Sequence, residues 1–225
     1  MPDQDRTQRL VDLSHLIVEG MTTYRDFPGP HICDFWTREE SARHYDDGSS
    51  FHIGRIDMIA NTGTYLDAPF HRYADSADVS GLELDQVAAL PGLVVRQPWE
   101  NGLAIGLEKF EGHDVEGKAV LVHTGWDRLW RTDAYFDNHP YLTAEAAEWL
   151  ADRGPRLVGI DSYNIDDTRT RARPVHSTLL GAGVLICEHM TNLGALPDQG
   201  FAFTAAPPKI EGMGTFPVRA FALLS

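Results

Sequence analysis

Apolar residues gather into short runs along this chain, and most of these runs have the length of a β-strand. Residues 119–124 form an almost unbroken apolar run with β-branched members, a pattern typical of a strand buried on both faces. Residues 10–17 alternate well enough to predict a first strand. The other predicted strands cover residues 51–60, 93–95, 157–161, 183–188, 201–205 and 216–224.

One helix is well defined by its apolar spacing and by the residues at its ends, and it covers residues 144–152. Thr143 can cap the first turn, and Gly154 can close the last. Because this helix separates two apolar strands, it predicts a βαβ crossover, which is normally right-handed. Shorter helical segments are predicted over residues 82–90, ended by Pro91-Gly92, and over residues 176–182.

Strands alternating with a few helices favour one α/β domain over residues 1–225, built as a mixed sheet flanked by helices. No internal repeat or linker divides the sequence. Residues 1–8 predict a loosely held terminus, and residues 38–50 predict a turn or a mobile flap. The sequence has no apolar run of about 18 residues and no apolar leader, so neither a membrane span nor a secretory signal is expected.

Composition and charge narrow the classes of function. The chain carries 33 acidic and 19 basic residues, a net charge of -14, which argues against a nucleic-acid or anionic-membrane surface. Cys33 and Cys187 lie far apart in the sequence. We therefore expect two free thiols and a cytoplasmic protein rather than a disulfide or a cysteine-based metal site.

The densest group of polar residues, residues 61–71, follows a predicted strand. Asn61, Tyr65, Asp67 and His71 share parity, so an extended chain would point Tyr65 and Asp67 to the same side. A glycine and a proline in this stretch predict that the strand ends in a loop. Such loops often build sites, although an ordinary turn in which the aspartate caps its own backbone stays open.

Three segments therefore offer polar groups that could meet: Asp67 with His71, then His176, then Glu188. Imidazole nitrogen and carboxylate oxygens together can bind a divalent cation. Ligands from separate strands are typical of catalytic metal sites, which keep one position open for water. The alternative is that each residue is structural, and Asp161 at another strand end is equally open to a ligand or a capping role.

Residues 61–71 resemble the signature His-x-Gly-Thr-His-x-Asp-x-Pro-x-His of the metal-dependent cyclase family, which includes bacterial kynurenine formamidases and isatin hydrolases. The resemblance extends over most of the chain and implies that family's fold, a swivelling β/β/α-like architecture. The segments similar to further family motifs are Val11-Asp12-Leu13-Ser14-His15, Val122-His123-Thr124-Gly125-Trp126, Gly159-Ile160-Asp161-Ser162, and His176-Ser177-Thr178-Leu179-Leu180 with Glu188.

The resemblance also implies roles for individual residues. Asp67, His176 and Glu188 match the family's metal ligands. His71 matches its catalytic histidine, which takes and gives the proton while water attacks a carbonyl, and an unperturbed pKa near neutral suits that task. The metal would make hydroxide available at neutral pH and polarise the carbonyl.

Two departures from the signature bear on the metal. Asn61 and Tyr65 stand where the family has two metal-ligating histidines, and neither a neutral amide nor a phenol with a pKa of about 10 is a good replacement. We therefore expect a single Mn²⁺ or Zn²⁺ ion, with Mg²⁺ also compatible. A site without metal stays open, in which protonated histidines balance the two carboxylates.

The favoured function is hydrolysis of a small amide, lactam, lactone or ester, with His71 as general acid and base and Tyr65 orienting substrate or stabilising the oxyanion. Two alternatives stay open. One is a metal-independent cyclase or dehydratase that uses His71 and Asp67, and the other is a disabled homologue with a binding or assembly role.

Several residues are expected to contact a small-molecule substrate. These candidates are Asn61, Phe35, Trp36 and Phe51. For the three aromatic residues, packing in a core or an interface is the alternative. The resemblance further implies a homodimer or homotetramer with pockets near a subunit boundary.

Overall fold

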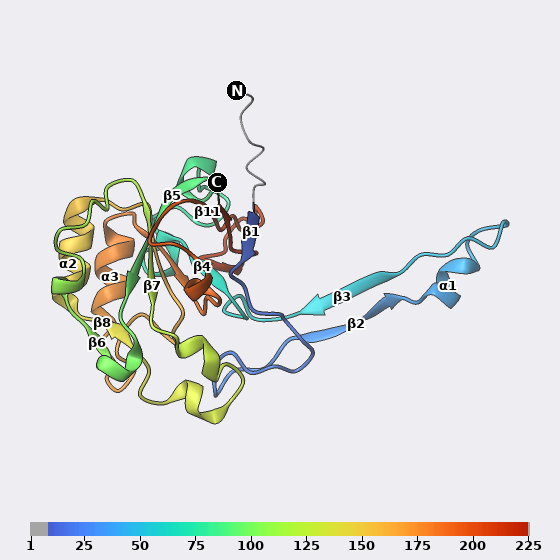
Figure 1. The fold of residues 1–225 in the computed structure, drawn as a ribbon. Helices are drawn as coiled ribbons and strands as arrows, with labels where there is room; N and C mark the ends of the chain where they lie inside the picture. Colours follow the sequence, from blue (N-terminus) through green and yellow to red (C-terminus); the bar gives the residue numbers. More distant parts are fainter. Residues whose placement is uncertain (1–8, 225) are drawn as a thin grey trace, which may run out of the picture.

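A large mixed sheet organises the protein (Figure 1). In this computed structural model, which describes residues 9–224, nine strands form one sheet in the order β1-β13-β11-β5-β7-β9-β10-β4-β12. Neighbours from β5 to β10 run parallel, whereas the pairs on either side are antiparallel. The strands are β1 (Arg9–Asp12), β4 (Tyr65–Asp67), β5 (Leu90–Arg96), β7 (Ala119–His123), β9 (Leu157–Ile160), β10 (Leu185–Glu188), β11 (Gln199–Thr204), β12 (Thr215–Pro217) and β13 (Phe221–Leu224).

Two helices, α2 (Ala144–Arg153) and α3 (Pro174–Gly181), lie side by side on one face of this sheet (Figure 1). They connect the parallel neighbours β7, β9 and β10, as the predicted crossover requires. α2 begins and ends as its sequence predicts, because Thr143 accepts a hydrogen bond from the amide of Ala146 and Gly154 takes a left-handed conformation.

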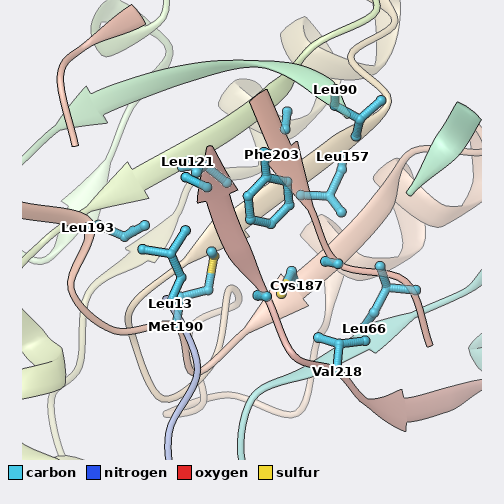
Figure 2. Packing of buried hydrophobic residues seen from close by; sticks show 14 of the residues in the cluster. Leu13, Leu66, Leu90, Leu121, Leu157, Cys187, Met190, Leu193, Phe203 and Val218 are labelled. Atoms are coloured by element: carbon cyan, nitrogen blue, oxygen red, sulfur yellow. The ribbon is translucent and has the colours of Figure 1, made fainter. Parts of the chain in front are cut away.

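The sheet is buried on both faces. Along β7, Val120 and Val122 pack in the core beneath α2 and α3, whereas Ala119 and Leu121 pack in a second core on the other face. This alternation confirms the burial predicted for the apolar run. Figure 2 shows the second core, in which Phe203 lies among leucines from several strands.

The chain between β12 and β13 forces the sheet to curl. Val218 to Ala220 connect β12, at one edge of the sheet, to β13, next to the opposite edge. So short a connection brings the two edges together around the second core, to which both Val218 and Ala220 contribute. The result is a single-domain α/β fold with a large curled sheet and few helices. The strand predicted over residues 216–224 is therefore wrong as one element, because the chain crosses between edges in its middle.

A two-stranded arm projects from the body (Figure 1). It pairs β2 (His31–Trp36) with β3 (Ile53–Asp57), and the predicted flap at its tip contains the short helix α1 (Arg38–Ala42). The strand predicted over residues 51–60 thus exists in part, but it pairs in the arm and not in the main sheet. The remaining elements are β6 (Ala104–Ile105) paired with β8 (Tyr141–Leu142), and the 3₁₀ turns η1 (Pro69–His71), η2 (Leu84–Gln86), η3 (Trp99–Asn101), η4 (Leu107–Lys109), η5 (Trp126–Leu129), η6 (Asp133–Phe136) and η7 (Leu193–Ala195).

Other predictions have mixed outcomes. The helix predicted over residues 82–90 is wrong beyond the single turn η2, because Ala89 takes a left-handed backbone and Leu90 already begins β5. The first strand is shorter than predicted and ends at Asp12. Among the described residues both cysteines are free, as expected. The predicted terminus, residues 1–8, lies outside the described part of the chain. None of the helices within residues 9–224 has the length and apolar character needed to cross a bilayer.

Candidate active site

Strand β4 carries two of the predicted site residues into the main sheet. It lies between β10 and β12, with Tyr65 opposite Glu188 and Asp67 opposite Thr215. The prediction that residues 61–71 form only a strand end and a loop is therefore wrong, since this stretch contains a fully buried strand. Tyr65 and Asp67 do point to one side, because the Tyr65 hydroxyl reaches Glu188 and the Asp67 carboxylate reaches His176 on the same face.

Asp67 is a buried carboxylate, and one of its two oxygens has no hydrogen-bond partner in the described chain. Its Oδ1 accepts a short hydrogen bond from the hydroxyl of Thr215. Its Oδ2 is buried, has no hydrogen-bond partner within residues 9–224, and lies 3.7 Å from Nε2 of His176. A buried carboxylate oxygen without a partner is costly, so this atom calls for a cation or a proton donor.

His176 is held in a fixed orientation at the start of α3. Its Nδ1 lies 2.6 Å from Oδ2 of Asp166, and Asp166 also accepts the amides of Val175 and His176, which caps the helix. In a neutral imidazole this bond leaves the lone pair on Nε2, which faces the oxygens of Asp67 and Glu188.

The charge on His176 reflects its neighbours. Burial lowers the pKa of His176, but Glu188, Asp166 and Asp67 outweigh it and raise the pKa to about 10. Without a metal ion the ring is thus the cation that balances these carboxylates. Burial raises the pKa of Glu188, which the positive His176 opposes.

Glu188 has both of its oxygens occupied. Oε1 accepts the amide of Ile165 at 2.6 Å, and Oε2 accepts the hydroxyl of Tyr65 at 2.5 Å. The Tyr65 hydroxyl lies 2.7 Å from that of Tyr24, to which Asn164 donates. Burial raises the pKa of both tyrosines well above 10, so the phenols stay protonated and act as donors in this chain.

His71 stands at the mouth of the site, at the end of η1. Its Nδ1 lies 2.9 Å from the Thr215 oxygen and 3.6 Å from Oδ1 of Asp67. Because the Thr215 hydroxyl gives its single proton to Asp67, it can only accept from Nδ1–H of His71. This assigns the lone pair of His71 to Nε2, and the partly exposed ring can take a proton there.

One cavity of about 330 Å³ joins most of these groups. Its lining includes Asn61, Tyr65, His71, His176 and Glu188, and the Asp67 carboxylate lies 3.6 Å from His71 and 3.7 Å from His176.

The three aromatic residues predicted to contact substrate, Phe35, Trp36 and Phe51, do not line this cavity. They lie on the arm, where the Trp36 ring is 5.7 Å from Phe51, so their predicted part in substrate binding has no support within one chain.

The donor set fits one divalent cation. Donor atoms of Asp67, His71 and His176 lie within 4.8 Å of one another. The partnerless Oδ2 of Asp67 and the oriented Nε2 of His176 are the two atoms best placed to ligate. Glu188 lies beside them, with Oε1 3.6 Å from Nε2 of His176. Tyr65 gives its hydroxyl to Glu188 rather than to this group, as expected for a poor ligand.

Sequence reasoning missed four residues that shape the site. Thr215 and Tyr24 come from segments with no local motif, so nothing in the sequence pointed to them. Asn164 and Asp166 follow the predicted strand 157–161 in a polar stretch, and that position at the carboxyl end of a parallel strand was a usable signal. Asp161 itself is structural, because its buried carboxylate accepts the amides of Thr124 and Gly125.

Known proteins share this arrangement of the chain. The model of the Cyclase family matches residues 11–167. The kynurenine formamidase of Bacillus cereus is 27% identical over 219 residues, which cover 96% of this chain and 97% of the relative. Isatin hydrolase A from Labrenzia aggregata, solved with benzyl benzoate, has a TM-score of 0.82 at 23% identity and covers 96% and 94% of the two chains. A structure described as a potential metal-dependent hydrolase with cyclase activity has a TM-score of 0.78 at 26% identity, covering 97% and 98%.

Proposed function

This chain belongs to the Cyclase family and is a hydrolase of that family, and on this basis we propose that it uses water to cleave the carbon–nitrogen bond of a small amide. The kynurenine formamidase relative is the reason to place an aryl formamide first among substrates. Lactams, lactones and esters undergo the same attack on a carbonyl and are the next substrates to test.

A single observation carries the proposal. Asp67 presents a buried oxygen without a partner to Nε2 of His176, and His71 stands next to both with a free lone pair. These are the parts that hydrolysis requires: groups that hold a cation, and a base at the mouth of the same cavity.

We assign the proton transfers to His71. Its Nε2 takes a proton from the attacking water as the water oxygen bonds to the carbonyl carbon. The same nitrogen then returns the proton to the leaving nitrogen as the carbon–nitrogen bond breaks. Thr215 holds the ring for both steps by linking Nδ1 to Asp67. Tyr65 has its hydroxyl committed to Glu188, so we give it a positioning role.

Asp67 and His176 would hold one divalent metal, with Glu188 as the neighbouring carboxylate. When bound, this ion supplies Lewis-acid polarisation and a lower pKa for water. One imidazole with carboxylate oxygens suits Mn²⁺ or Zn²⁺. The relatives do not favour the alternatives considered from the sequence, a metal-independent cyclase or a disabled binding homologue.

The direct test is hydrolysis of N-formylkynurenine and of small lactones by the purified chain. We expect turnover that falls about 100-fold to 10,000-fold in His71→Ala, the usual loss for a general base. His113→Ala removes an exposed histidine that does not line the cavity and should keep full activity. Full turnover in His71→Ala would overturn the assignment.

The remaining proposals concern location and assembly. We propose a cytoplasmic protein, supported by the two free thiols. We also propose a homodimer or homotetramer in which the arm packs against another copy. Ile32, Ile53 and Ile56 on its strands are exposed, and a two-stranded ribbon alone is marginally stable in water.

A further inference from the structure

Two arginines that line the cavity lack an acidic partner in the described part of the chain. Arg72 and Arg173 line the cavity that holds His71 and His176, and neither has a carboxylate oxygen within 4.0 Å among residues 9–224. Ten of the fifteen described arginines have no such partner, so what distinguishes Arg72 and Arg173 is that they line this cavity. Among the described residues that line the cavity, Glu188 is the only carboxylate, and its two oxygens are already occupied.

The neighbouring arginines, unlike Arg72 and Arg173, form ion pairs with carboxylates. A second cavity of about 740 Å³ shares Tyr24, Phe27, Asn164 and Arg173 with the first. Its other two arginines are paired, Arg25 with Asp137 at 3.0 Å and Arg169 with Asp167 at 2.9 Å. Among the described arginines that line these two cavities, Arg72 and Arg173 lack a carboxylate partner, and both line the cavity that holds His71 and His176.

Both unpaired arginines are held in place by α3 and the residues before it. Arg173 donates from Nη1 to the carbonyls of Thr170 and Ala172, each at 2.7 Å, which leaves Nε and Nη2 without a partner among the described residues. Arg72 donates from Nη2 to the hydroxyl of Ser177 at 2.9 Å. A guanidinium fixed on one side and free on the other can hold a carboxylate with two parallel hydrogen bonds.

Aromatic side chains line the same cavity as the two arginines. Phe27 is 53% exposed, and its ring centroid lies 5.7 Å from that of Tyr24, whose ring in turn lies 5.0 Å from Tyr163. A flat ring could pack here and gain contact area. The opening therefore offers an apolar surface next to two free cationic groups.

We infer that Arg72 and Arg173 select substrates that carry a carboxylate, so that the substrate is a small aromatic amide with an anionic group. This inference rests on the proposed function for the amide, but the arginine site itself does not depend on turnover. Arg173, half-buried, makes the larger contribution, and the more exposed Arg72 adds less because water screens it.

The test compares matched substrates and matched variants. 2-Formamidobenzoate carries the carboxylate, and N-(2-nitrophenyl)formamide replaces it with a neutral group of the same shape. In Arg173→Met, and more so with Arg72→Met added, kcat/KM should fall about tenfold to 100-fold on the carboxylate substrate. It should stay within about twofold on the nitro substrate. Arg173→Lys should recover part of the loss, and Arg169→Met, which removes a paired arginine, should change neither substrate.

Binding without turnover separates this inference from the proposed function. Calorimetric titration with 2-aminobenzoate and with 2-nitroaniline should show tighter binding of the anion, and the Arg173→Met and Arg72→Met pair should remove that preference. A preference that survives in the double variant, or an equal loss on both substrates, would overturn the inference. If the chain hydrolyses neither substrate but shows the preference and its loss, the arginine site stands and the proposed amide hydrolysis fails.

Discussion

At the scale of single residues, Thr215 has the most specific place in the site. Its hydroxyl lies between Asp67 and His71 and can satisfy both only by donating to one and accepting from the other. That arrangement fixes which nitrogen of His71 is basic. A histidine in the other tautomer would present an N–H to the water and could not accept its proton.

Replacing Thr215 by valine keeps the shape of the side chain and removes this link. We expect kcat to fall about tenfold to 100-fold with KM little changed, because a hydrogen bond to a charged group contributes about 1.5–3 kcal/mol. Steady-state kinetics on a formamide substrate checks this result. Thr215→Ser keeps the hydroxyl and should retain most activity, so equal impairment of both variants would argue for a packing role instead.

The site residues that could be predicted from the sequence are those that share a recognisable sequence motif. Asp67 and His71 share a single motif, and His176 and Glu188 share another, so their meeting was expected and the geometry supports it. Thr215 and Arg173 could not be found this way. Thr215 contacts His71, which lies 144 residues away in the sequence. Arg173 is marked by its place on the cavity lining and by the lack of a carboxylate partner among the described residues. Neither feature leaves a local signal in the sequence.

At the scale of elements, β5 shows why local signals can mislead. Pro91-Gly92 resembles a helix stop, yet both residues lie within β5. The reason is found across the sheet, where the ring of Phe201 in β11 packs directly on Gly92. By contrast, α2 carries its own cap, inner face and closing glycine, and its bounds followed almost completely from its sequence.

Gly92→Ala should therefore weaken the pairing of β5 with β11. A β-carbon at Gly92 would lie 1.9 Å from an atom of the Phe201 ring, so the ring or the strand must move. Overpacking of this kind costs about 1–3 kcal/mol, which corresponds to a fall in Tm of several degrees. Calorimetry measures the shift. Gly54→Ala in the arm, where the nearest atom is 3.4 Å away, is the control and should leave Tm nearly unchanged.

At the scale of the whole molecule, the curled body and the projecting arm differ in how much of their surface is buried. The body buries both faces of its sheet, whereas every residue of β3 is exposed. The sequence predicted a strand here but not its partner, because an alternating pattern does not say which sheet a strand joins. An arm with apolar residues on its surface is the feature that most favours assembly.

The arm's role can be tested with Ile32 and Ile56, which face each other across its two strands. We expect the wild-type chain to be a dimer or tetramer by light scattering coupled to gel filtration. The double variant Ile32→Ser and Ile56→Ser should shift it toward the monomer while circular dichroism stays unchanged. A wild-type chain that is monomeric at all concentrations would contradict the proposed assembly.

The stability of the fold in acid should depend on histidines whose pKa is lowered by burial, and half-buried His15 is one of them. Burial lowers its pKa to about 4, partly opposed by Asp127, and its Nε2 is buried without a partner in the described chain. The unfolded chain binds this proton near pH 6.5 and the folded chain does not. Stability from this residue is thus present above pH 6.5 and is lost as the pH falls toward 4, by at most about 1.4 kcal/mol per pH unit.

His15→Phe preserves a ring to stack on Trp130, 4.2 Å away, and removes the titrating group. Urea unfolding at several pH values should show that the variant loses less stability than the wild type between pH 6.5 and pH 4. Parallel pH curves for the two proteins would mean that His15 does not titrate differently on folding.

We propose that Asp67 and His176 hold one catalytic metal ion next to His71. The most direct test of this proposal is the metal content of the purified full chain after gel filtration, measured by elemental analysis for the wild type and Asp67→Asn, with the exposed Asp198→Asn as control. We expect about one divalent ion per chain in the wild type and the control, and a large loss in Asp67→Asn. A wild-type chain that holds no metal after loading with Mn²⁺ or Zn²⁺, or an Asp67→Asn variant with full occupancy, would contradict the proposal.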